Sequence, residues 1–405
     1  MVKILEGVRV VEGAAFVAAP LAGMTLAQMG ADVIRFDRLR GGLDYSRWPL
    51  TENGRSLFWA GLNKGKRSIA VDMATPQGQE IITRLIVGEG TGDDGIYLTN
   101  LRVRGWMSYE ELSKKRKDLI MMMILGDRHG GPQVDYTINP AVGFPSATGP
   151  EGLANPVGHV LPAWDCITGQ QAALGILAAK RHRRKHGVGQ LVELALKDMA
   201  LSILGNLGII GEMTLNGEER EKIGNSLYGA YAQDFVCKCG ERIMVIGLTE
   251  RQWKNLKKAT GTMEVFNDLA AELGADLSLE GERYLHRHAI TEKLKPFFDS
   301  VSVKDIAKKF DDLGVTWSVY KTFKQAVETD PDISADNPMF TRLHHPGIGT
   351  YLTPGNPISF SNAERVEPRR APALGENTEE ILHEIGYSGG QIAKFYDDKV
   401  VASAG

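Results

Sequence analysis

Cysteine is scarce in this chain, and long apolar runs are missing from it. Only three cysteines stand among 405 residues, so they cannot all pair within one chain. Cys237 and Cys239 are also too close in an extended segment to bridge easily, which argues against a disulfide framework. No segment approaches the roughly 18 uninterrupted apolar residues of a membrane span. The sequence therefore predicts reduced thiols and no membrane partner.

The N-terminus lacks the marks of a secretion signal, and the chain lacks a strong charge of either sign. MVKILEGVRVVEG has neither the apolar core nor the cleavage site of a signal peptide and has the pattern of a first strand. We therefore expect a cytoplasmic protein. The formal net charge of -3 gives no overall attraction to nucleic acid or to an anionic membrane. An anionic ligand would have to be held by local cations.

Two phosphate-binding signatures are also missing. No G-x-G-x-x-G follows a predicted strand and no P-loop pattern occurs, so the sequence supports neither nicotinamide nor ATP chemistry. Cys237-Lys-Cys239 could begin a metal site, but only Cys166 remains as a further thiol. A hairpin turn is the favoured interpretation, and we predict no metal site.

What is present indicates an α/β protein of more than one unit. At 405 residues the chain exceeds the size at which single cores stop growing, and 43% of it is apolar. Strand-like and helix-like stretches alternate through the first 125 residues, which predicts a parallel, doubly wound sheet. The expected strands are 8–11, 32–36, 68–71, 95–98 and 119–125, and the expected helices 20–29 and 77–87. Ligands of such sheets bind outside the carboxyl ends of the strands.

The second half of the chain has a different pattern. Residues 166–186 predict a long helix that ends in the cationic run KRHRRKHG, with Gly187 as its C-cap. A strand over 190–196 and a helix over 197–210 should follow. From about residue 228 a hairpin and then helices indicate a separate α+β unit. Residues 330–358, rich in Pro, Gly, His and Asn without clear period, predict a linker back to the first unit.

One acidic residue stands between apolar residues in HVLPAWDCITG, at the start of the long predicted helix. One interpretation is that Asp165 is the N-cap and accepts hydrogen bonds from first-turn amides. The other is that the helix dipole and amides keep this carboxylate ionised, so that it attacks an acyl carbon. Spacing leaves both open, because one residue can serve both purposes.

A group of cations lies near the expected ligand crevice. Arg38 follows the second strand, and Asn63, Lys64, Lys66 and Arg67 precede the third. A phosphorylated ligand would need several cations and a donor-rich arginine fork. The alternative is a solvated cationic loop. The cluster is more informative than any of its members.

Taken together, these motifs resemble the class III, or CaiB/BaiF, CoA-transferase family. The matching segments lie in family order over nearly the whole chain: LEGVRVVEGAAFVAAPLAGMTLAQMGADVIRFDR, NKGKRSIAVDMATPQGQE, the Asp165 segment, GILAAKRHRRKHGVGQLVELALKDMA, NPMF and PALGENTEEIL. Four others, GGLDYSRWP, SLFWAGLNKGKRSI, HVLPAWD and LYGAYAQDF, resemble members that move CoA between the C1 and C4 carboxylates of mesaconyl-CoA, or 2-methylfumaryl-CoA. Those members serve the autotrophic 3-hydroxypropionate cycle of carbon fixation.

The resemblance implies a Rossmann-like large domain built from both chain ends, a smaller α+β middle domain, and an interlocked homodimer. The implied ranges are 1–200 for the N-terminal part of the large domain, 201–227 for a linker, 228–328 for the small domain, 329–350 for a second linker and 351–405 for the return to the large domain. Some family members close their sites with a tetraglycine loop. The equivalent residues 246–249 contain no glycine run, which puts that gating mechanism in doubt here.

The resemblance also implies roles for particular residues. Asp165 is the implied nucleophile, which would carry CoA as a thioester. We further expect Tyr45, Arg47 and His159 to hold the free carboxylate of the substrate. The CoA-binding positions that the family implies are Val17, Ala18, Arg38, Val71, Asp72, Met73, Ala74, Asn100, Leu101 and Arg104.

The implied reaction is CoA transfer within one dicarboxylate, with no cofactor beyond the CoA of the substrate. Three alternatives stay open. The first is transfer between an acyl-CoA and a separate carboxylic acid. The second is a racemase of the same fold, which would need a His/Asp pair, for which His159 and Asp165 are candidates. The third is a non-catalytic acyl-CoA binding protein in which Asp165 is only a cap.

Overall fold

The computed structural model describes residues 1–89 and 93–403. By their contacts they form two compact units. The first combines Met1–Val142, Val160–Leu215 and Pro331–Gly405, so it draws on both ends of the chain. The second combines Gly143–His159 and Asn216–Asp330. The segment 143–159, which we had placed in the large domain, groups with the second unit.

The first unit is built on a seven-stranded sheet of order β12-β3-β2-β1-β4-β5-β6. All neighbours are parallel except β12, which pairs antiparallel with β3 at the edge. The order β3-β2-β1-β4-β5-β6 confirms the Rossmann-like prediction. The direction of winding reverses between β1 and β4, and a crevice forms there. The strands are β1 (Arg9–Gly13), β2 (Asp32–Asp37), β3 (Arg67–Val71), β4 (Ile96–Thr99), β5 (Ile120–Leu125), β6 (Gln190–Ala195) and β12 (Val401–Ala402).

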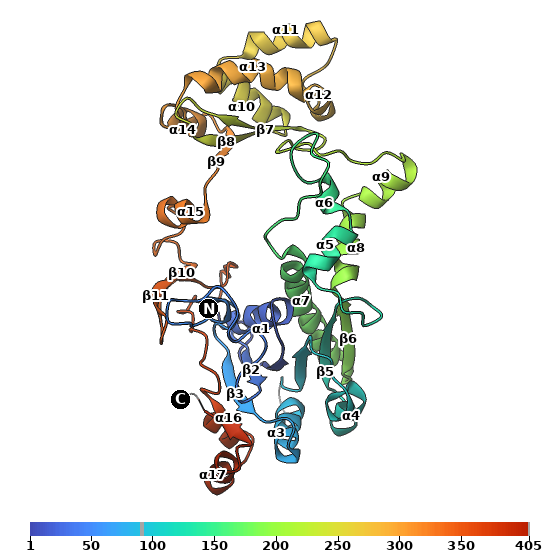
Figure 1. The fold of residues 1–405 in the computed structure, drawn as a ribbon, viewed down its shortest axis with the longest axis vertical. Coiled ribbons are helices and arrows are strands. Elements are labelled where there is room, and N and C mark those ends of the chain that lie inside the picture. The colour runs from blue at the N-terminus through green and yellow to red at the C-terminus, as the bar shows by residue number, and fades with distance from the viewer. Residues whose placement is uncertain (90–92, 404–405) are drawn as a thin grey trace. The chain divides into compact units, whose positions relative to one another are not determined.

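Helices cover this sheet because its central strands are apolar on both faces, as in β5 with the sequence IMMMIL. In Figure 1, α16 from the C-terminal end lies beside β3 from the N-terminal end. The long helix α7 ends at Gly187 in a left-handed conformation, φ 71°, as predicted. The helices of this unit are α1 (Ala18–Gln28), α2 (Leu57–Leu62), α3 (Pro76–Val87), the 3-10 helix η1 (Gly105–Met107), α4 (Tyr109–Lys115), α5 (Asp135–Ala141), α7 (Ala163–His186), α8 (Leu196–Asn206), α9 (Ile209–Leu215), α16 (Thr378–Glu384) and α17 (Gly389–Asp397).

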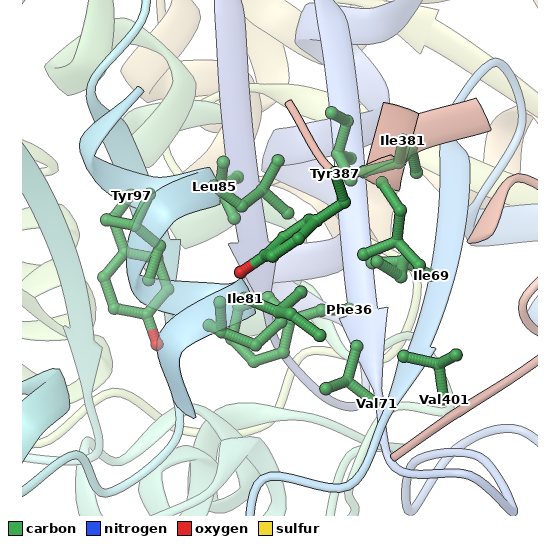
Figure 2. Close-up of a cluster of buried hydrophobic side chains, with 14 of the residues drawn as sticks. Phe36, Ile69, Val71, Ile81, Leu85, Tyr97, Ile381, Tyr387 and Val401 are labelled. Atoms are coloured by element: carbon green, nitrogen blue, oxygen red, sulfur yellow. The ribbon is translucent and has the colours of Figure 1, made fainter. Parts of the chain in front are cut away.

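The core of the first unit joins the two ends of the chain. Phe36 and Ile69 of the sheet are fully buried with Ile81 of α3, and Ile381 of α16 packs into the same cluster (Figure 2). Each such side chain contributes roughly 1.5–3 kcal/mol when removed from water. The C-terminal segment is therefore part of the core rather than an appendage.

The second unit is an α+β domain, as predicted. Its sheet is antiparallel, of order β7-β8-β9, and Cys237 lies in the β7–β8 turn, where its carbonyl accepts from Gly240 N at 2.8 Å. Its elements are α6 (Phe144–Ala147), β7 (Tyr231–Val236), β8 (Arg242–Gly247), α10 (Glu250–Thr260), α11 (Met263–Leu273), α12 (Glu280–Leu285), α13 (Arg287–Ser300), α14 (Val303–Asp312), β9 (Thr316–Val319) and α15 (Phe323–Thr329).

The stretch 246–249 belongs to this folded unit. Gly247 ends β8, and Thr249 caps α10 by accepting from Gln252 N. The buried Arg283 donates to Gly247 O at 3.0 Å and to Leu248 O at 2.6 Å. The backbone of the stretch 246–249 is thus held by hydrogen bonds from the Arg283 side chain.

Both segments that we predicted as linkers contain secondary structure. The segment 330–358 contains an antiparallel hairpin, β10 (Phe340–His345) and β11 (Gly349–Pro354). Its strands are only partly buried, so they carry no apolar alternation; stacking of His345 on Tyr351 and backbone pairing define the hairpin instead. The segment 201–227 likewise contains α9. None of the helices in the described part of the chain is both long and apolar enough to cross a membrane.

Candidate active site

The turn after β1 forms one wall of the crevice where the sheet order reverses. Asn100, just after β4, clamps it: its Oδ1 accepts from Ala15 N at 2.9 Å and its Nδ2 donates to Ala15 O at 2.7 Å. Phe16 follows in the left-handed region with φ 67°. A non-glycine residue there is strained, and such strain persists only where neighbouring contacts impose it.

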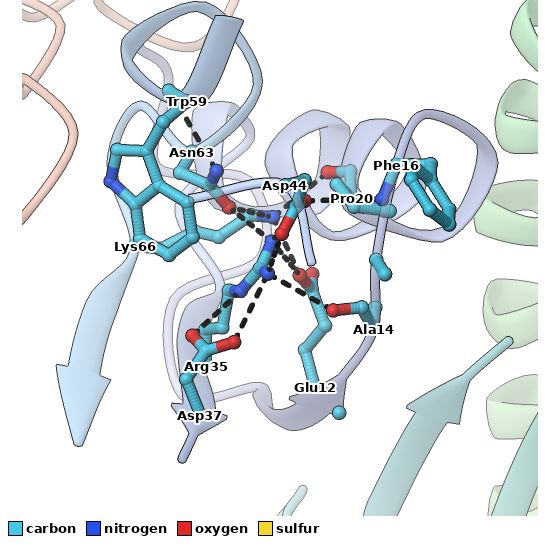
Figure 3. Close-up of polar contacts among 12 residues, drawn as sticks. Glu12, Ala14, Phe16, Pro20, Arg35, Asp37, Asp44, Trp59, Asn63 and Lys66 are labelled. Atoms are coloured by element: carbon cyan, nitrogen blue, oxygen red, sulfur yellow. Dashed lines mark hydrogen bonds and ion pairs between the residues drawn. The ribbon is translucent and has the colours of Figure 1, made fainter. Parts of the chain in front are cut away.

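A buried polar network under this turn supplies those contacts (Figure 3). Arg35 Nη2 donates to Asp44 Oδ1 at 2.7 Å, and Arg35 Nε to Asp37 Oδ2 at 2.9 Å. Asp44 Oδ2 in turn accepts from Phe16 N at 3.1 Å. Lys66 Nζ donates to Glu12 Oε1 at 2.8 Å. The network ties the β1–α1 turn to the loop that begins after β2.

This arrangement corrects the predicted cationic cluster at 63–67. Asn63 and Lys66 are buried in the network, and Arg67 pairs with Asp32 and Glu384, so these residues are neither phosphate ligands nor a solvated loop. Lys64 is also buried, and burial lowers its pKa to about 8. The sequence showed the cations but not the carboxylates that pair with Lys66 and Arg67, which come from β1, β2 and α16.

Asp165 is the third residue of α7, and the prediction that it is the N-cap was wrong. Pro162 occupies the N-cap position without a side-chain hydrogen bond. The buried Asp135 of α5 supplies the cap instead: its Oδ2 accepts from Trp164 N at 2.8 Å and from Asp165 N at 3.2 Å. The carboxylate of Asp165 is thus released from capping its own helix.

Close packing of α7 on α1 places Asp165 near the crevice. A Cβ at Gly169 would stand 2.7 Å from Ala18 O and 3.1 Å from Leu21 Cβ, so only glycine allows this approach. Asp165 precedes Gly169 by four residues and lies on the same helix face. The first turn of α1 therefore packs against the second turn of α7, one turn from Asp165.

The environment of Asp165 shifts its titration. Burial, and after it the neighbouring Asp135 carboxylate, raise the pKa of Asp165 to about 6, although the Arg47 guanidinium lowers it. The helix start does not lower the pKa below its ordinary value, because burial and the Asp135 charge outweigh it. About nine-tenths of the carboxyl is still ionised at pH 7. Burial and the two carboxylates also raise the pKa of Cys166, so that side chain is a neutral thiol at pH 7.

Three of the positions predicted to bind CoA line one cavity. Arg38, Met73 and Leu101, which follow β2, β3 and β4, surround a space of about 200 Å³ together with residues of the β1–α1 turn. All lie at the carboxyl edge of the sheet, where a doubly wound fold binds its ligands.

The other predicted CoA positions are placed as follows. The side chain of Val71 is fully buried in the core, and that of Asn100 is occupied by the Ala15 backbone. Arg104 is exposed just before η1. Val17 is at the N-cap position of α1, Ala18 begins that helix, Asp72 accepts from Ala74 N through its Oδ1 at 3.0 Å, and Ala74 is exposed.

The three residues predicted to hold the substrate carboxylate lie in different parts of the structure. Arg47 is close enough for its charge to lower the pKa of Asp165. Tyr45 instead packs edge-on against Trp59, with ring centroids 4.9 Å apart, and lines a different cavity of about 480 Å³ with Arg55, His345 and Arg370 among its walls. His159 belongs to the second unit, so its role stays a prediction.

Comparison with known proteins adds to this geometry. A model of CoA-transferase family III matches residues 5–378. The chain belongs to this family. It is 52% identical over 404 residues to the 2-methylfumaryl-CoA isomerase of Chloroflexus aurantiacus, covering 99% of this chain and 98% of that protein. It is 27% identical to the succinyl-CoA:mesaconate CoA-transferase of Haloarcula hispanica, covering 95% and 97%.

The fold agrees with that assignment. A solved CaiB/BaiF family protein from Brucella suis matches with a TM-score of 0.77 and 25% identity, over 95% of this chain and all of that one. The family resemblance and the fold class read from the sequence are both confirmed.

Sequence reasoning missed several residues that lie at the candidate site of this CoA-transferase family member. Asp135 acts on α7 from 30 residues earlier, a separation that no local motif signals. Phe16 and Phe58 flank Arg47, with each ring centroid 5.3 Å from its guanidinium carbon. The aromatic residue in the small-residue turn GAAFVAAP was the one available signal.

Proposed function

We propose that this chain is a 2-methylfumaryl-CoA isomerase, which moves CoA from the C1 to the C4 carboxylate of the same dicarboxylate to give 3-methylfumaryl-CoA. The 52% identity over the full length to the Chloroflexus aurantiacus isomerase carries this proposal. The site supports it, because the charge of Arg47 acts on the partly buried carboxylate of Asp165, on a helix that packs beside the β1–α1 turn of a Rossmann-like sheet.

The proposed reaction begins with Asp165. Its carboxylate attacks the thioester carbonyl, the bond from C1 to sulfur breaks, CoA leaves as a thiolate, and a mixed anhydride of Asp165 and the acid remains. The thiolate then attacks the aspartyl carbonyl, which gives an Asp165 CoA-thioester and a free dicarboxylate. The dicarboxylate next attacks through C4, and the same steps in reverse transfer CoA to C4.

The surrounding residues would position the reactants. Arg38 would bind a CoA phosphate, and the Ala18 amide at the start of α1 would stabilise an oxyanion. The burial that raises the pKa of Asp165 also makes this carboxylate more basic and so a better nucleophile. We further propose that the enzyme is a cytoplasmic, interlocked homodimer, needs no metal or redox cofactor, and serves the 3-hydroxypropionate cycle.

Incubation with 2-methylfumaryl-CoA and isotopically labelled free mesaconate would test the intramolecular reaction. We expect conversion to 3-methylfumaryl-CoA without any added acid and without label in the product. Crotonyl-CoA, which has no second carboxylate, is the control and should give no isomer. A requirement for added acid, or label in most of the product, would instead favour transfer between two separate acids, as in the Haloarcula hispanica relative.

Asp135→Asn should extend activity to lower pH. Asn keeps an oxygen that accepts from the Trp164 and Asp165 amides but removes the charge that raises the pKa of Asp165. Activity depends on ionised Asp165 and is lost as the pH falls through its pKa, about 6 in the wild type. The acidic limb of kcat/KM should therefore move down by less than about one pH unit. The control is Asp299→Asn, which removes an exposed ion pair and should leave the acidic limb unchanged. An upward shift of the limb in Asp135→Asn would refute the role of the Asp135 charge.

A further inference from the structure

The backbone of Arg47 is held by hydrogen bonds, whereas its guanidinium has no hydrogen-bonding partner among the described residues. Its carbonyl accepts from Ser56 Oγ at 2.6 Å, and its amide donates to Asp44 O at 3.2 Å. Asp44 is itself held by the buried Arg35. In the described part of the chain, by contrast, the guanidinium of Arg47 has neither a hydrogen bond nor an ion pair within bonding distance, and the residue is exposed.

Two aromatic rings orient this guanidinium. Phe16 and Phe58 each hold their ring centroid 5.3 Å from its central carbon, within the range of a cation–π contact. The rings limit the positions that the side chain can take while leaving its N–H donors open. Such a fork is preorganised for a planar carboxylate.

We propose that Arg47 binds the free carboxylate of the acyl-CoA substrate and retains the dicarboxylate while CoA is attached to Asp165, which makes the transfer intramolecular. This inference rests on the proposed function and names the residue that decides between transfer within one acid and transfer between two.

The charges of the reaction explain why Arg47 suits this role. Before the reaction, Asp165 carries one negative charge and the substrate carries one on its free carboxylate. After the CoA thiolate has attacked the aspartyl carbonyl, Asp165 is a neutral thioester and the dicarboxylate carries two negative charges. Arg47 therefore loses one anionic neighbour when a second carboxylate appears on the acid beside it. The attraction that held Asp165 is transferred to the dicarboxylate, and the total charge at the site is unchanged.

Four other cations of the first unit have their own partners or line another part of the sheet edge. Arg35 and Lys66 are saturated by buried carboxylates, and Arg370 pairs with Glu376. Arg38 lines the cavity at the ends of β2 and β3. Arg47 instead lies at the β1–α1 turn, with its guanidinium carbon 5.3 Å from the centroid of the Phe16 ring, just before the first turn of α1 on which α7 packs at Gly169.

The test compares Arg47→Gln with the wild type, with Arg47→Lys and with Arg55→Gln, an exposed arginine of the same loop. Each protein is given 2-methylfumaryl-CoA and labelled mesaconate, and three quantities are measured: KM, label in the thioester products, and the Asp165 CoA-adduct by mass spectrometry. For Arg47→Gln we expect KM to rise about 10–100-fold, label to enter the products, and the adduct still to form. Arg47→Lys should recover part of the retention, and Arg55→Gln should match the wild type.

The outcomes separate the possible failures. If Arg47→Gln isomerises its substrate with unchanged KM and no label, the inference is wrong. It is also wrong if the variant loses the adduct at unchanged KM, because Arg47 would then act on Asp165 alone. A wild-type protein that incorporates label fully would overturn the proposed function itself, and that result does not depend on the variant. If Arg47→Gln fails to fold, Arg47→Lys decides, because it should still incorporate several times more label than the wild type, and a lysine variant without label would make the inference wrong.

Discussion

Replacing Asp165 with alanine should abolish turnover while leaving the protein folded. Under the proposed mechanism both activated species, the anhydride and the CoA thioester, form on this carboxylate. We expect kcat to fall by about 10⁴-fold or more, as for other enzymes that lose a nucleophile. Mass spectrometry should find a CoA adduct on the Asp165 peptide of the wild type and none in the variant. Activity above a tenth of the wild-type value would refute the covalent mechanism.

The stability of the same variant provides the control. The folded-state pKa of Asp165, about 6, is above its ordinary value of 3.8, so the ionised carboxylate costs folding free energy at neutral pH. This cost is absent at pH values below the ordinary value and grows as the pH rises through that range. Asp165→Ala should therefore melt at or above the wild-type temperature at pH 7, with a smaller difference near pH 4. A lowered midpoint at pH 7 would contradict this account.

Arg35→Ala should have the largest effect on stability. Arg35 is almost completely buried and pairs with Asp37 at 2.9 Å and Asp44 at 2.7 Å. Removing it leaves these carboxylates in the interior without their cation, which costs about 3–5 kcal/mol. For a unit of this size the thermal midpoint should fall by roughly 10 °C, measured by circular dichroism or calorimetry.

The matched control for Arg35→Ala is Lys114→Ala, which breaks an exposed pair with Glu111 in the same unit. Exposed pairs contribute at most about 1 kcal/mol, so its midpoint should stay near the wild-type value. Arg35→Lys should lie between the two, because one ammonium cannot reproduce the fork that serves both carboxylates. Equal midpoints for Arg35→Ala and Lys114→Ala would show that the buried network does not hold the unit together.

The strands and helices of the first half of the chain could be predicted because the residues that form each element locally are also the ones that pack into the core. Strand β5 was predicted as 119–125 and is Ile120–Leu125; helix α3 was predicted as 77–87 and is Pro76–Val87. Both are amphipathic or apolar over their whole length, so tertiary contacts reinforce what the residues prefer alone.

The site was predicted less completely, because its key contacts join distant residues. The sequence indicated an acid at the start of α7, but the capping role belongs to Asp135, and the cations at 63–67 find their partners on other strands. The hairpin β10–β11 was missed for a related reason: its strands are stabilised by pairing with each other and not by an apolar face. Residue types were visible in the sequence, whereas their partners were not.

Because α7 takes its cap from Asp135, the scaffold places no demand on residue 165. If Asp165 capped α7, any substitution at this position would also destabilise the helix. Here Asp135 provides the cap, and Asp165 is left for the proposed chemistry. Side chains of other chemistry can therefore be tried at position 165 without removing the cap of α7.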